Sequence, residues 1–390
     1  MIIDDIGWFF SFFNKNSGFS AERQIDPTSL LPKGGFMFPL YSLKGSPREI
    51  GRQYGASCPE KIHKNIDLYF RVFKHYADLD RTRAVRLAQS FIPVIEAFDR
   101  DLLEEMRGIA EGAGAQFEEI LSINVRTELM YPDQLAGKGE CTALAALPEA
   151  TASGDMLLGQ NWDWKPHLLE TTILLRLEQE AKPTVLTLTE AGIVGKIGCN
   201  SAGLGACLNI LKSSLAEVGV PIHILMRGIL NSERLGDAIG KIVSLNRGSS
   251  NNTLIAHRDG AAIDFEMAPK DLDFLYPENG VLVHTNNFVS PRLRPLDTGL
   301  SQFPDTLVRW GRARQRMLGR AGRIGVADFK EILGDHCNHP DSICRHPDPR
   351  DPELERVKTV ASVIMNLTRG EMHLTQGPPC TNPHQTIAFP

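Results

Sequence analysis

The sequence predicts an α+β fold in which antiparallel sheets are covered by layers of helices. Two observations support this prediction. Apolar residues recur every three or four positions through much of residues 45–140, which is typical of helices. After Cys141 the chain changes to short β-prone runs that are separated by turn residues and occur in adjacent pairs, with helical stretches between the groups.

The predicted elements follow one another in groups. In the first group, a helical pattern over residues 91–98 continues into residues 102–110, and Gly112 and Gly114 mark the end of that helix. Residues 117–129 are predicted to form another helix. Further helices are predicted over residues 221–230, 235–243, 304–318 and 326–333. Strands are predicted over residues 142–147, 156–158, 171–177, 184–189, 193–199, 204–210, 252–257, 261–267 and 281–285, and a final hairpin over 360–366 and 371–375. The charged, proline-rich residues 346–352 are predicted to form an exposed loop.

Composition limits the class of protein. The chain has 390 residues, enough for one large domain or two ordinary ones, with 42% hydrophobic and 23% charged residues and a formal net charge of −5. Neutralising phosphates requires a cationic face, so this mildly acidic chain is not expected to bind nucleic acid. It contains no run of about 18 apolar residues, so no membrane-spanning segment is expected.

The N-terminal region and the cysteines indicate in which cellular compartment the protein is expected. Residues 6–13 are apolar but few, and Asp4 and Asp5 stand where a signal peptide would carry basic residues. We expect this segment to dock on the body of the protein; the alternative is contact with a membrane surface or a partner. The seven cysteines form no CxxC pair, which argues against a disulfide framework and favours a reducing, cytoplasmic location.

Two short motifs have ordinary interpretations. The run Asp335-His336-Cys337-Asn338-His339, with Cys344 and His346 nearby, has the composition of a metal site but fits no standard zinc spacing. We therefore interpret it as a polar loop and predict no metal ion. The glycines of residues 198–205 match no phosphate-binding motif and are interpreted as a hairpin turn.

A third set of residues is chemically suggestive but, taken from spacing alone, remains ambiguous. Cys141 could be a buried thiol or a nucleophile, and Asn161 or Asp163 could be turn residues. Asn286 could cap a strand, and Arg356 could be a solvated charge.

Several blocks in a fixed order make the chain resemble the acyl-coenzyme A:isopenicillin N acyltransferase family, also called the C45 peptidase family. The blocks are Gly45-Ser46-Pro47-Arg48-Glu49-Ile50-Gly51, Gly108-Ile109-Ala110-Glu111-Gly112-Ala113, Cys141-Thr142-Ala143, Gly159-Gln160-Asn161-Trp162-Asp163-Trp164, Thr189-Glu190-Ala191-Gly192-Ile193-Val194-Gly195-Lys196-Ile197-Gly198, Asn200-Ser201-Ala202-Gly203, Gly219-Val220-Pro221, Val283-His284-Thr285-Asn286, Ser342-Ile343-Cys344-Arg345 and Gly377-Pro378-Pro379. The likeness covers residues 41–380.

The resemblance implies an N-terminal nucleophile hydrolase with a four-layer αββα sandwich. Members of this family are made as precursors that cut themselves before a cysteine. Here the implied cleavage site is the bond between Glu140 and Cys141, which divides the chain into a helical small subunit, residues 1–140, and a catalytic body, residues 141–390. The change of pattern at Cys141 agrees with this division.

The resemblance also assigns roles to four residues. Cys141 is the nucleophile, Asp163 holds and polarises its amine, and Asn286 donates to the oxyanion. Arg356, placed by counting back from Glu371 and Gly377, is the catalytic arginine, and Lys358 is the nearest alternative cation. A thiol with a pKa of about 8.5 needs a base at neutral pH, and a freed α-amine with a pKa of about 8 supplies one.

One residue departs from the family pattern. The archetype has glycine before the nucleophile, whereas this chain has Glu140 and keeps a glycine one position earlier, at Gly139. Glutamate restricts the backbone and adds a charge beside the thiol. We therefore predict that self-cleavage is slower here or depends on pH.

The predicted protein is an amidase or acyltransferase that acts on a small N-acyl compound. The family includes penicillin-forming acyltransferases and hydrolases of β-alanyl amines. No cofactor is predicted, and no coenzyme A motif is present to favour transfer over hydrolysis. The alternatives are a coenzyme A-dependent N-acyltransferase of isopenicillin N type and a non-catalytic binding relative on the same scaffold. The expected partners are the substrate and the chain's own N-terminal fragment, with no nucleic acid or membrane; homo-oligomer formation is left open.

Overall fold

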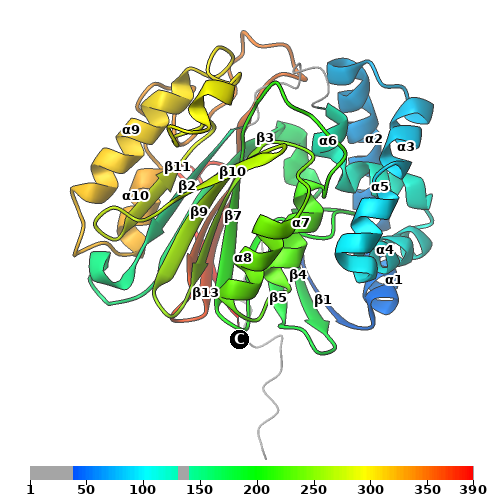
Figure 1. The fold of residues 1–390 in the computed structure, drawn as a ribbon, viewed down its shortest axis with the longest axis horizontal. Coiled ribbons are helices and arrows are strands. Elements are labelled where there is room, and N and C mark those ends of the chain that lie inside the picture. Colours follow the sequence, from blue (N-terminus) through cyan, green and yellow to red (C-terminus); the bar gives the residue numbers. More distant parts are fainter. Residues whose placement is uncertain (1–37, 131–139, 390) are drawn as a thin grey trace, which may run out of the picture.

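The computed structural model describes residues 38–130 and 140–389. The predicted docking segment, residues 6–13, and Gly139 lie outside these ranges. Two β-sheets are stacked face to face, and helices cover both outer faces (Figure 1). This arrangement confirms the predicted α+β fold and the four-layer αββα sandwich.

The larger sheet has eight strands among the described residues. In spatial order they are β1 (Leu40–Gly45), β4 (Thr172–Gln179), β5 (Val185–Glu190), β6 (Ile197–Asn200), β7 (Leu204–Ile210), β8 (Asn251–His257), β9 (Ala261–Ala268) and β10 (Asp271–Leu275). Neighbours are antiparallel except that β1 pairs parallel with β4. The N-terminal part of the chain therefore supplies an edge strand to this sheet.

The smaller sheet has six antiparallel strands among the described residues. In spatial order they are β11 (Val281–His284), β2 (Glu140–Ala146), β3 (Leu157–Trp164), β12 (Lys358–Asn366), β13 (Glu371–Gln376) and β14 (Gln385–Ala388). Strands β2 and β3 lie in the middle of the order, so the predicted cleavage site falls inside a central strand.

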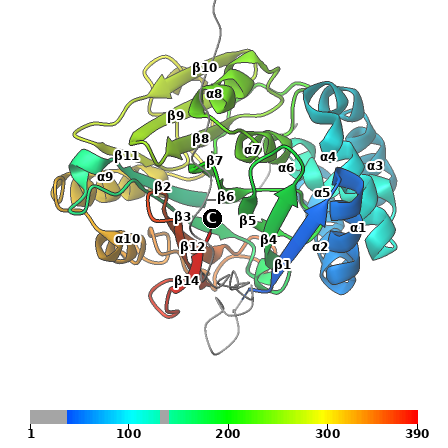
Figure 2. The ribbon, with the colours of Figure 1, turned by 90° about the horizontal axis from the view of Figure 1, so that it is seen from below.

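The helices form two outer layers. Those on the larger sheet are α1 (Pro47–Ser57), α2 (Pro59–Ala77), α3 (Arg81–Gln89), α4 (Ile92–Ala113), α5 (Phe117–Asn124), α6 (Arg126–Met130), α7 (Ile222–Leu230) and α8 (Leu235–Ser244). Those on the smaller sheet are α9 (Asp305–Leu318) and α10 (Val326–Leu333). Figure 2 shows α9 and α10 on one side of the stacked sheets and the other helices on the opposite side and flank.

Alternation of side chains along the strands explains the layers. In β2 and β3, Ala143, Ala145 and Leu158 belong to the core between the sheets, whereas Leu144 and Leu157 belong to the core under α9 and α10. Successive residues of a strand point to opposite faces, so one strand serves both cores. Strands buried on both faces usually read as continuous apolar runs, and β3 departs from this rule at the buried polar residues Gln160, Asn161 and Asp163.

The structure also differs from the prediction in places. The single helix predicted over residues 117–129 is interrupted at Val125, where the backbone leaves helical geometry. At this break the Asn124 side chain bonds to the backbone of Gly192 and Val194. The strand predicted from residue 193 begins only at Ile197, because residues around Gly192 form a turn with a φ of 92°.

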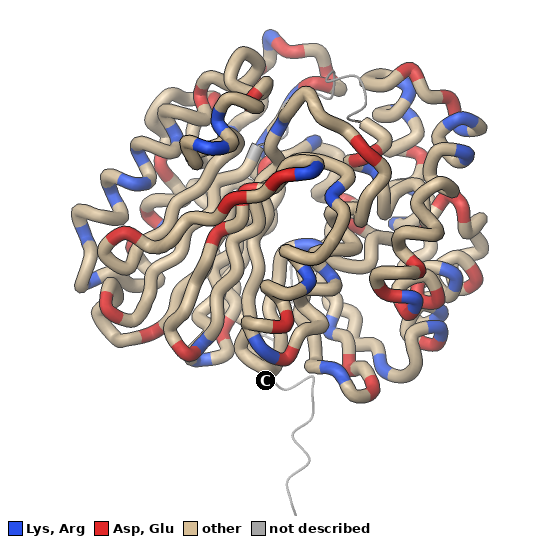
Figure 3. Tube along the Cα trace, in the orientation of Figure 1, with Lys and Arg blue, Asp and Glu red and all other residues tan. Residues whose placement is uncertain are grey.

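Charges are spread over the molecule. Figure 3 shows acidic and basic residues interspersed along the outer helices in this view.

No helix among the described residues combines the length and apolar character needed to cross a membrane.

Candidate active site

Cys141 occupies the second position of β2, between β11 and β3. It is 6% exposed, and its register partner is Trp162 on β3. Its backbone N–H donates to Asn286 Oδ1 at 2.8 Å, and its backbone carbonyl accepts from Arg309 Nη1 at 2.9 Å. The peptide unit that would become the new N-terminus is thus held by side chains from other elements.

The side chains of Cys141 and Asp163 lie on opposite faces of the smaller sheet. Cys141 and Trp162 belong to the core between the sheets. Asp163 follows Trp162 in β3 and therefore points toward the outer helices. The thiol and the carboxylate therefore point to opposite faces of the sheet, although the charge of Asp163 still raises the pKa of the thiol.

Asp163 is 1% exposed and is held by one hydrogen bond, from Thr359 Oγ1 on β12 to Oδ1 at 2.7 Å. Thr359 Oγ1 in turn accepts from the backbone N–H of Arg345 at 3.0 Å. Among the described residues, Asp163 Oδ2 has no hydrogen-bond partner. Burial raises the pKa of Asp163 to about 6, and the charges of Arg345 and Arg309 oppose this effect.

Asn286 follows β11 and has a fixed amide orientation. Arg309 Nη2 can only donate, and it contacts Asn286 Oδ1 at 3.2 Å. The carbonyl oxygen of Ile210 can only accept, and it receives a hydrogen bond from Asn286 Nδ2 at 2.9 Å. The amide oxygen therefore faces the Cys141 nitrogen. The bond to Ile210 uses one of the two amide protons and leaves the other available for an oxyanion.

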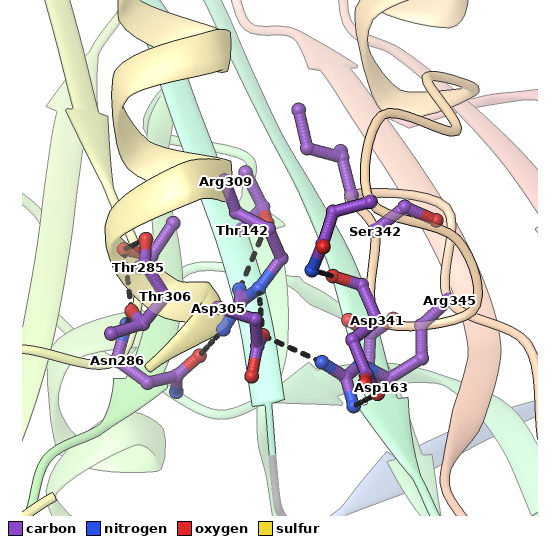
Figure 4. Close-up of polar contacts among 12 residues, drawn as sticks. Thr142, Asp163, Thr285, Asn286, Asp305, Thr306, Arg309, Asp341, Ser342 and Arg345 are labelled. Carbon is purple, nitrogen blue, oxygen red and sulfur yellow. Dashed lines mark hydrogen bonds and ion pairs between the residues drawn. The ribbon is translucent and has the colours of Figure 1, made fainter. Parts of the chain in front are cut away.

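Two buried arginines share one carboxylate beside this site. Asp305 Oδ2 at the start of α9 accepts from Arg309 Nε at 2.9 Å and from Arg345 Nη2 at 2.6 Å. Arg345 Nη1 also pairs with Asp341 at 2.8 Å. Figure 4 shows Arg309 between Asn286 and Asp305, and Arg345 between Asp305 and Asp341. This network fixes the positive charge next to Asp163.

The structure does not bring Arg356 to the other predicted site residues. Its guanidinium donates to the carbonyl oxygens of Asp351 and Pro349 in its own loop. The alternative cation, Lys358, interacts electrostatically with Cys380. The contacts favour Arg345 and Arg309 over both. Arg345 ends the block Ser342-Ile343-Cys344-Arg345, so a sequence signal for it was present, whereas Arg309 had none.

Lys196 is a further residue that the sequence analysis did not single out. Its amine lies 3.4 Å from the centre of the Trp162 ring and 2.7 Å from Glu190 Oε1. It is 3% exposed, and burial lowers its pKa to about 7 although Glu190 opposes this. Its charge also interacts with the Cys141 thiol. Lys196 lies within the long block that carries the family resemblance, but no feature of the sequence marks it.

A narrow pocket of about 20 Å³ opens beside Cys141. It is lined by Arg126, Thr127, Met130, Cys141, Trp162, Asp163, Trp164, Lys196, Leu208 and Ile210. Among the described residues, the buried hydroxyl of Thr127 has no hydrogen-bond partner. The pocket thus offers aromatic and aliphatic walls with a few polar groups, which suits a small, mostly apolar ligand.

A larger pocket of about 250 Å³ lies near the first. Leu129 and Leu211 line it, and they are the chain neighbours of Met130 and Ile210 in the first pocket. Its lining includes the partly exposed apolar residues Leu87, Leu215 and Val218. A ligand longer than the first pocket would extend into this one.

The chemistry of the intact chain is set by the state of the thiol. Burial raises the pKa of Cys141 to about 11, and the charge of Asp163 adds to the effect. Hydrogen bonds from the Asp163 backbone and the Gln160 side chain act in the opposite direction. The thiol is therefore protonated at neutral pH, and it needs a base to act as a nucleophile.

Sequence comparisons identify relatives of the chain. The sequence profile of a family described as acyl-coenzyme A:6-aminopenicillanic acid acyl-transferase matches residues 150–379. The chain is 31% identical over 304 residues to the acyl-coenzyme A:6-aminopenicillanic-acid-acyltransferase 40 kDa form of Emericella nidulans, covering 77% of this chain and 83% of that protein. It is 25% identical over 241 residues to protein dcd1A of Dictyostelium discoideum, covering 53% of each.

The solved structures that align with this chain are less similar to it in sequence than the relatives above. Penicillin V acylase from Agrobacterium tumefaciens aligns with a TM-score of 0.46 and 12% identity, covering 64% of this chain and 86% of that one. The Caenorhabditis elegans ortholog of N-acylethanolamine-hydrolyzing acid amidase aligns with a TM-score of 0.42 and 16% identity, covering 58% of this chain and 93% of that one. At these values the relationship rests on the sequence matches.

Proposed function

Because the chain belongs to the acyl-coenzyme A:6-aminopenicillanic acid acyltransferase family, we propose that it cleaves the amide bond of a small N-acyl compound through a thioester on Cys141. We propose further that the chain first cuts itself between Glu140 and Cys141. The products are a small subunit, residues 1–140, and a catalytic subunit, residues 141–390.

One observation carries the proposal. The backbone nitrogen of Cys141, which the proposed cleavage would turn into an α-amine, is held 2.8 Å from Asn286 Oδ1. The side chain of Cys141 lines a pocket. A structural thiol does not require its own nitrogen to be bound by a buried side chain. In a central strand, that nitrogen would ordinarily bond to a neighbouring backbone carbonyl.

Self-cleavage would begin with attack of the Cys141 sulfur on the carbonyl carbon of Glu140. The sulfur–carbon bond forms, the peptide bond breaks, and the thiol proton passes to the Cys141 nitrogen. Water then hydrolyses the thioester, which releases the Glu140 carboxylate and regenerates the thiol. The new α-amine would stay beside Asn286 Oδ1 and would interact with the carboxylate of Asp163.

In the mature protein the α-amine serves as the base for its own thiol. The thiolate attacks the substrate carbonyl, and the second proton on Asn286 Nδ2 stabilises the oxyanion. The amine of the substrate leaves after taking a proton from the α-ammonium group. Water or another amine then attacks the thioester. Hydrolysis is the simpler outcome, because transfer requires a site that excludes water.

The pocket composition narrows the substrate. Trp162, Leu208 and Ile210 suit an apolar acyl group, and the Thr127 hydroxyl can bond to its polar end. The larger pocket nearby would receive the rest of the molecule. The coenzyme A-dependent transferase and the non-catalytic relative remain the alternatives.

The test compares the wild-type protein with Cys141→Ala. Scaling the chain's 43.2 kDa by the lengths of the two parts predicts wild-type fragments of about 15 and about 28 kDa, the larger beginning with cysteine. Cys141→Ala should stay uncleaved and should not turn over a panel of N-acyl amino acids and β-alanyl amines. Gel electrophoresis, N-terminal sequencing and the panel assay provide the measurements.

Cys337→Ala is the matched control, since Cys337 is a free, exposed cysteine outside the pocket. It should cleave and turn over like the wild type. A wild-type chain that stays intact at every pH, with no thiol labelling at Cys141, would instead favour the non-catalytic relative.

A further inference from the structure

Four metal-binding side chains converge outside the pocket of Cys141. They are His336, Cys344, His346 and Cys380, and their ligand atoms all lie within 4.8 Å of one another. The first three belong to the segment between α10 and β12, and Cys380 follows β13. We propose that these four side chains bind one Zn²⁺ ion.

The distances between the ligand atoms support a tetrahedral site. His346 Nε2 lies 3.2 Å from His336 Nε2, 3.6 Å from Cys344 Sγ and 3.4 Å from Cys380 Sγ. Zinc–nitrogen bonds of about 2.0–2.1 Å and zinc–sulfur bonds of about 2.3 Å on a tetrahedron place ligand atoms about 3.3–3.8 Å apart. The three distances from His346 Nε2 are close to this range, and the remaining ligand atoms lie within 4.8 Å of one another.

The donor set matches the chemistry of Zn²⁺. Two thiolates neutralise the charge of the dication, and two imidazole nitrogens complete a Cys₂His₂ set, which is common in structural zinc sites. Four protein ligands leave no open position for substrate, so the site would be structural. The two imidazoles also direct their Nε2 atoms toward each other, an arrangement that a shared metal explains better than a single hydrogen bond between them.

A disulfide between Cys344 and Cys380 is the competing use of these thiols. Both cysteines are free in the structure. A disulfide would engage only the two sulfur atoms and would leave the convergence of His336 and His346 unexplained. The zinc site accounts for all four residues.

The site would stabilise the segment that carries Arg345. This arginine lies between the ligands Cys344 and His346 in the chain, and its side chain reaches Asp305 beside the proposed catalytic residues. Other contacts of the segment include backbone bonds from Cys344 to Asp335 and from His346 to Pro340. A metal bridge to Cys380 would tie it to the end of the smaller sheet as well.

The sequence spacing concealed this site because the fourth ligand lies 34 residues beyond His346. The run at residues 335–339 looked like a metal motif, but only His336 of that run is a ligand. Cys337 and His339, the more conspicuous neighbours, are not members of the group.

The test measures metal content in the full chain, expressed without a metal-binding tag in zinc-supplemented medium. Mass spectrometry of the dialysed protein should give about one zinc per chain, as a closed four-ligand site requires. Cys380→Ser and His336→Ala should lose the metal and should show a lower Tm. Both residues are exposed, so the variants are expected to fold. Cys337→Ser, a change of the same kind on the same loop, should keep the metal.

Cobalt substitution gives a second measurement that does not depend on activity. Wild-type protein stripped by a chelator and loaded with Co²⁺ should show thiolate-to-cobalt charge-transfer bands and strong visible bands of a tetrahedral site, and Cys380→Ser should weaken them. A wild-type chain that binds neither metal, or that carries a Cys344–Cys380 disulfide in a non-reducing peptide map, would overturn the proposal. These readouts are independent of whether the chain cleaves itself.

Discussion

Asp163 is kept ionised near neutral pH by charges that lie across the outer face of the smaller sheet. Burial raises its pKa to about 6, and the largest opposing effect is the charge of Arg345. Arg345 also holds Thr359, the hydroxyl donor to Asp163, through its backbone. Arg345 is therefore a positioning residue whose side chain sets the charge state of the group that would bind the new amine.

We predict that Arg345→Met shifts the acid limb of turnover to higher pH. Without the guanidinium charge the pKa of Asp163 rises, so the carboxyl becomes protonated at a pH where the wild type is still ionised. The expected shift is about one pH unit, the lower end of the effect of a nearby opposite charge. The measurement is kcat/KM across pH. Arg345→Lys, which keeps a charge, should shift the limb less.

Arg356→Ala tests whether the arginine that acts on Asp163 is Arg356, as assigned from the sequence, or Arg345, as the contacts favour. Because the Arg356 guanidinium bonds only to carbonyl groups of its own loop among the described contacts, the variant should keep the wild-type pH profile. A profile that moves with Arg356→Ala and stays in place with Arg345→Met would restore the assignment made from sequence.

Glu128 gives a pH-dependent prediction for stability. Burial raises its pKa from 4.5 to about 7. A raised folded-state pKa gives stability that is fully present below pH 4.5 and lost as pH rises through 7. Glu128→Gln cannot ionise, so its Tm relative to wild type should increase from pH 5 to pH 8. The difference corresponds to at most about 3 kcal/mol.

The control for Glu128→Gln is Glu60→Gln, at an exposed position of α2. It should leave the pH dependence of Tm unchanged. Glutamine at position 128 can still accept from the Ile222 N–H and the Ser249 hydroxyl, so any loss of packing should be the same at each pH. A Tm difference that is constant across this range would contradict the prediction.

At the scale of elements, periodicity located most of the helices and strands but not their pairing. Buried strands such as β5 and β7 were predicted within a residue or so, because β-branched and apolar runs end at clear turns. Three edge strands, β1, β10 and β14, were missed. Edge strands are only partly buried, so they carry weak alternation, and β10 has no fully buried residue.

Helices α1 and α4 cross with glycine against glycine. A methyl group on Gly108 would lie 2.3 Å from the Arg48 carbonyl oxygen and 2.9 Å from Gly51 Cα. The same group on Gly240 of α8 would meet nothing within 4 Å. These two helical glycines therefore differ only in whether a neighbouring backbone approaches.

We predict opposite effects for the same substitution at these positions. Gly108→Ala should destabilise the fold by about 1–3 kcal/mol, since the two backbones must separate. Gly240→Ala should stabilise it by up to about 1 kcal/mol through helix propensity. Urea unfolding midpoints, measured in the uncleaved Cys141→Ala background, provide the comparison. Equal shifts at both positions would rule out the close crossing.

At the scale of the molecule, residues before the proposed cut are bound to the body on several sides. Strand β1 pairs with β4 over six register positions. Arg227 of α7 forms two 2.9 Å bonds to Glu105 of α4, and both side chains are buried. Removing one partner of such a pair is costly, so the pair resists separation of the two parts.

The two fragments should therefore stay together after cleavage. Size-exclusion chromatography of cleaved wild type should give one peak containing both fragments, at the elution volume of uncleaved Cys141→Ala. The fragments should separate only in denaturant. Two peaks under native conditions would show that β1 and the helices do not hold the small part.

The candidate active site divides into residues that the sequence could predict and residues that it could not. Cys141, Asp163 and Asn286 were predicted because each lies in a motif next to a strand, and the structure brings all three to one place. Arg356 was assigned by counting through a loop that has no periodic pattern, and the structure places Arg345 and Arg309 nearer the other predicted residues. Arg309 reaches the site only when α9 packs on the smaller sheet, and Lys196, which precedes β6 of the larger sheet, reaches it only when the sheets stack.

Because the proposed scissile bond lies inside β2, folding of the chain must precede self-cleavage. Glu140 is in register with Asp163, and Asp163 is held by Thr359 on β12, near the far end of the chain. On the proposed function, the residues up to β12 must therefore be synthesised and folded onto β3 before the site of the cut is complete. Cleavage would then act as a proofreading step: a truncated or misfolded chain stays in one piece and never exposes a reactive amine.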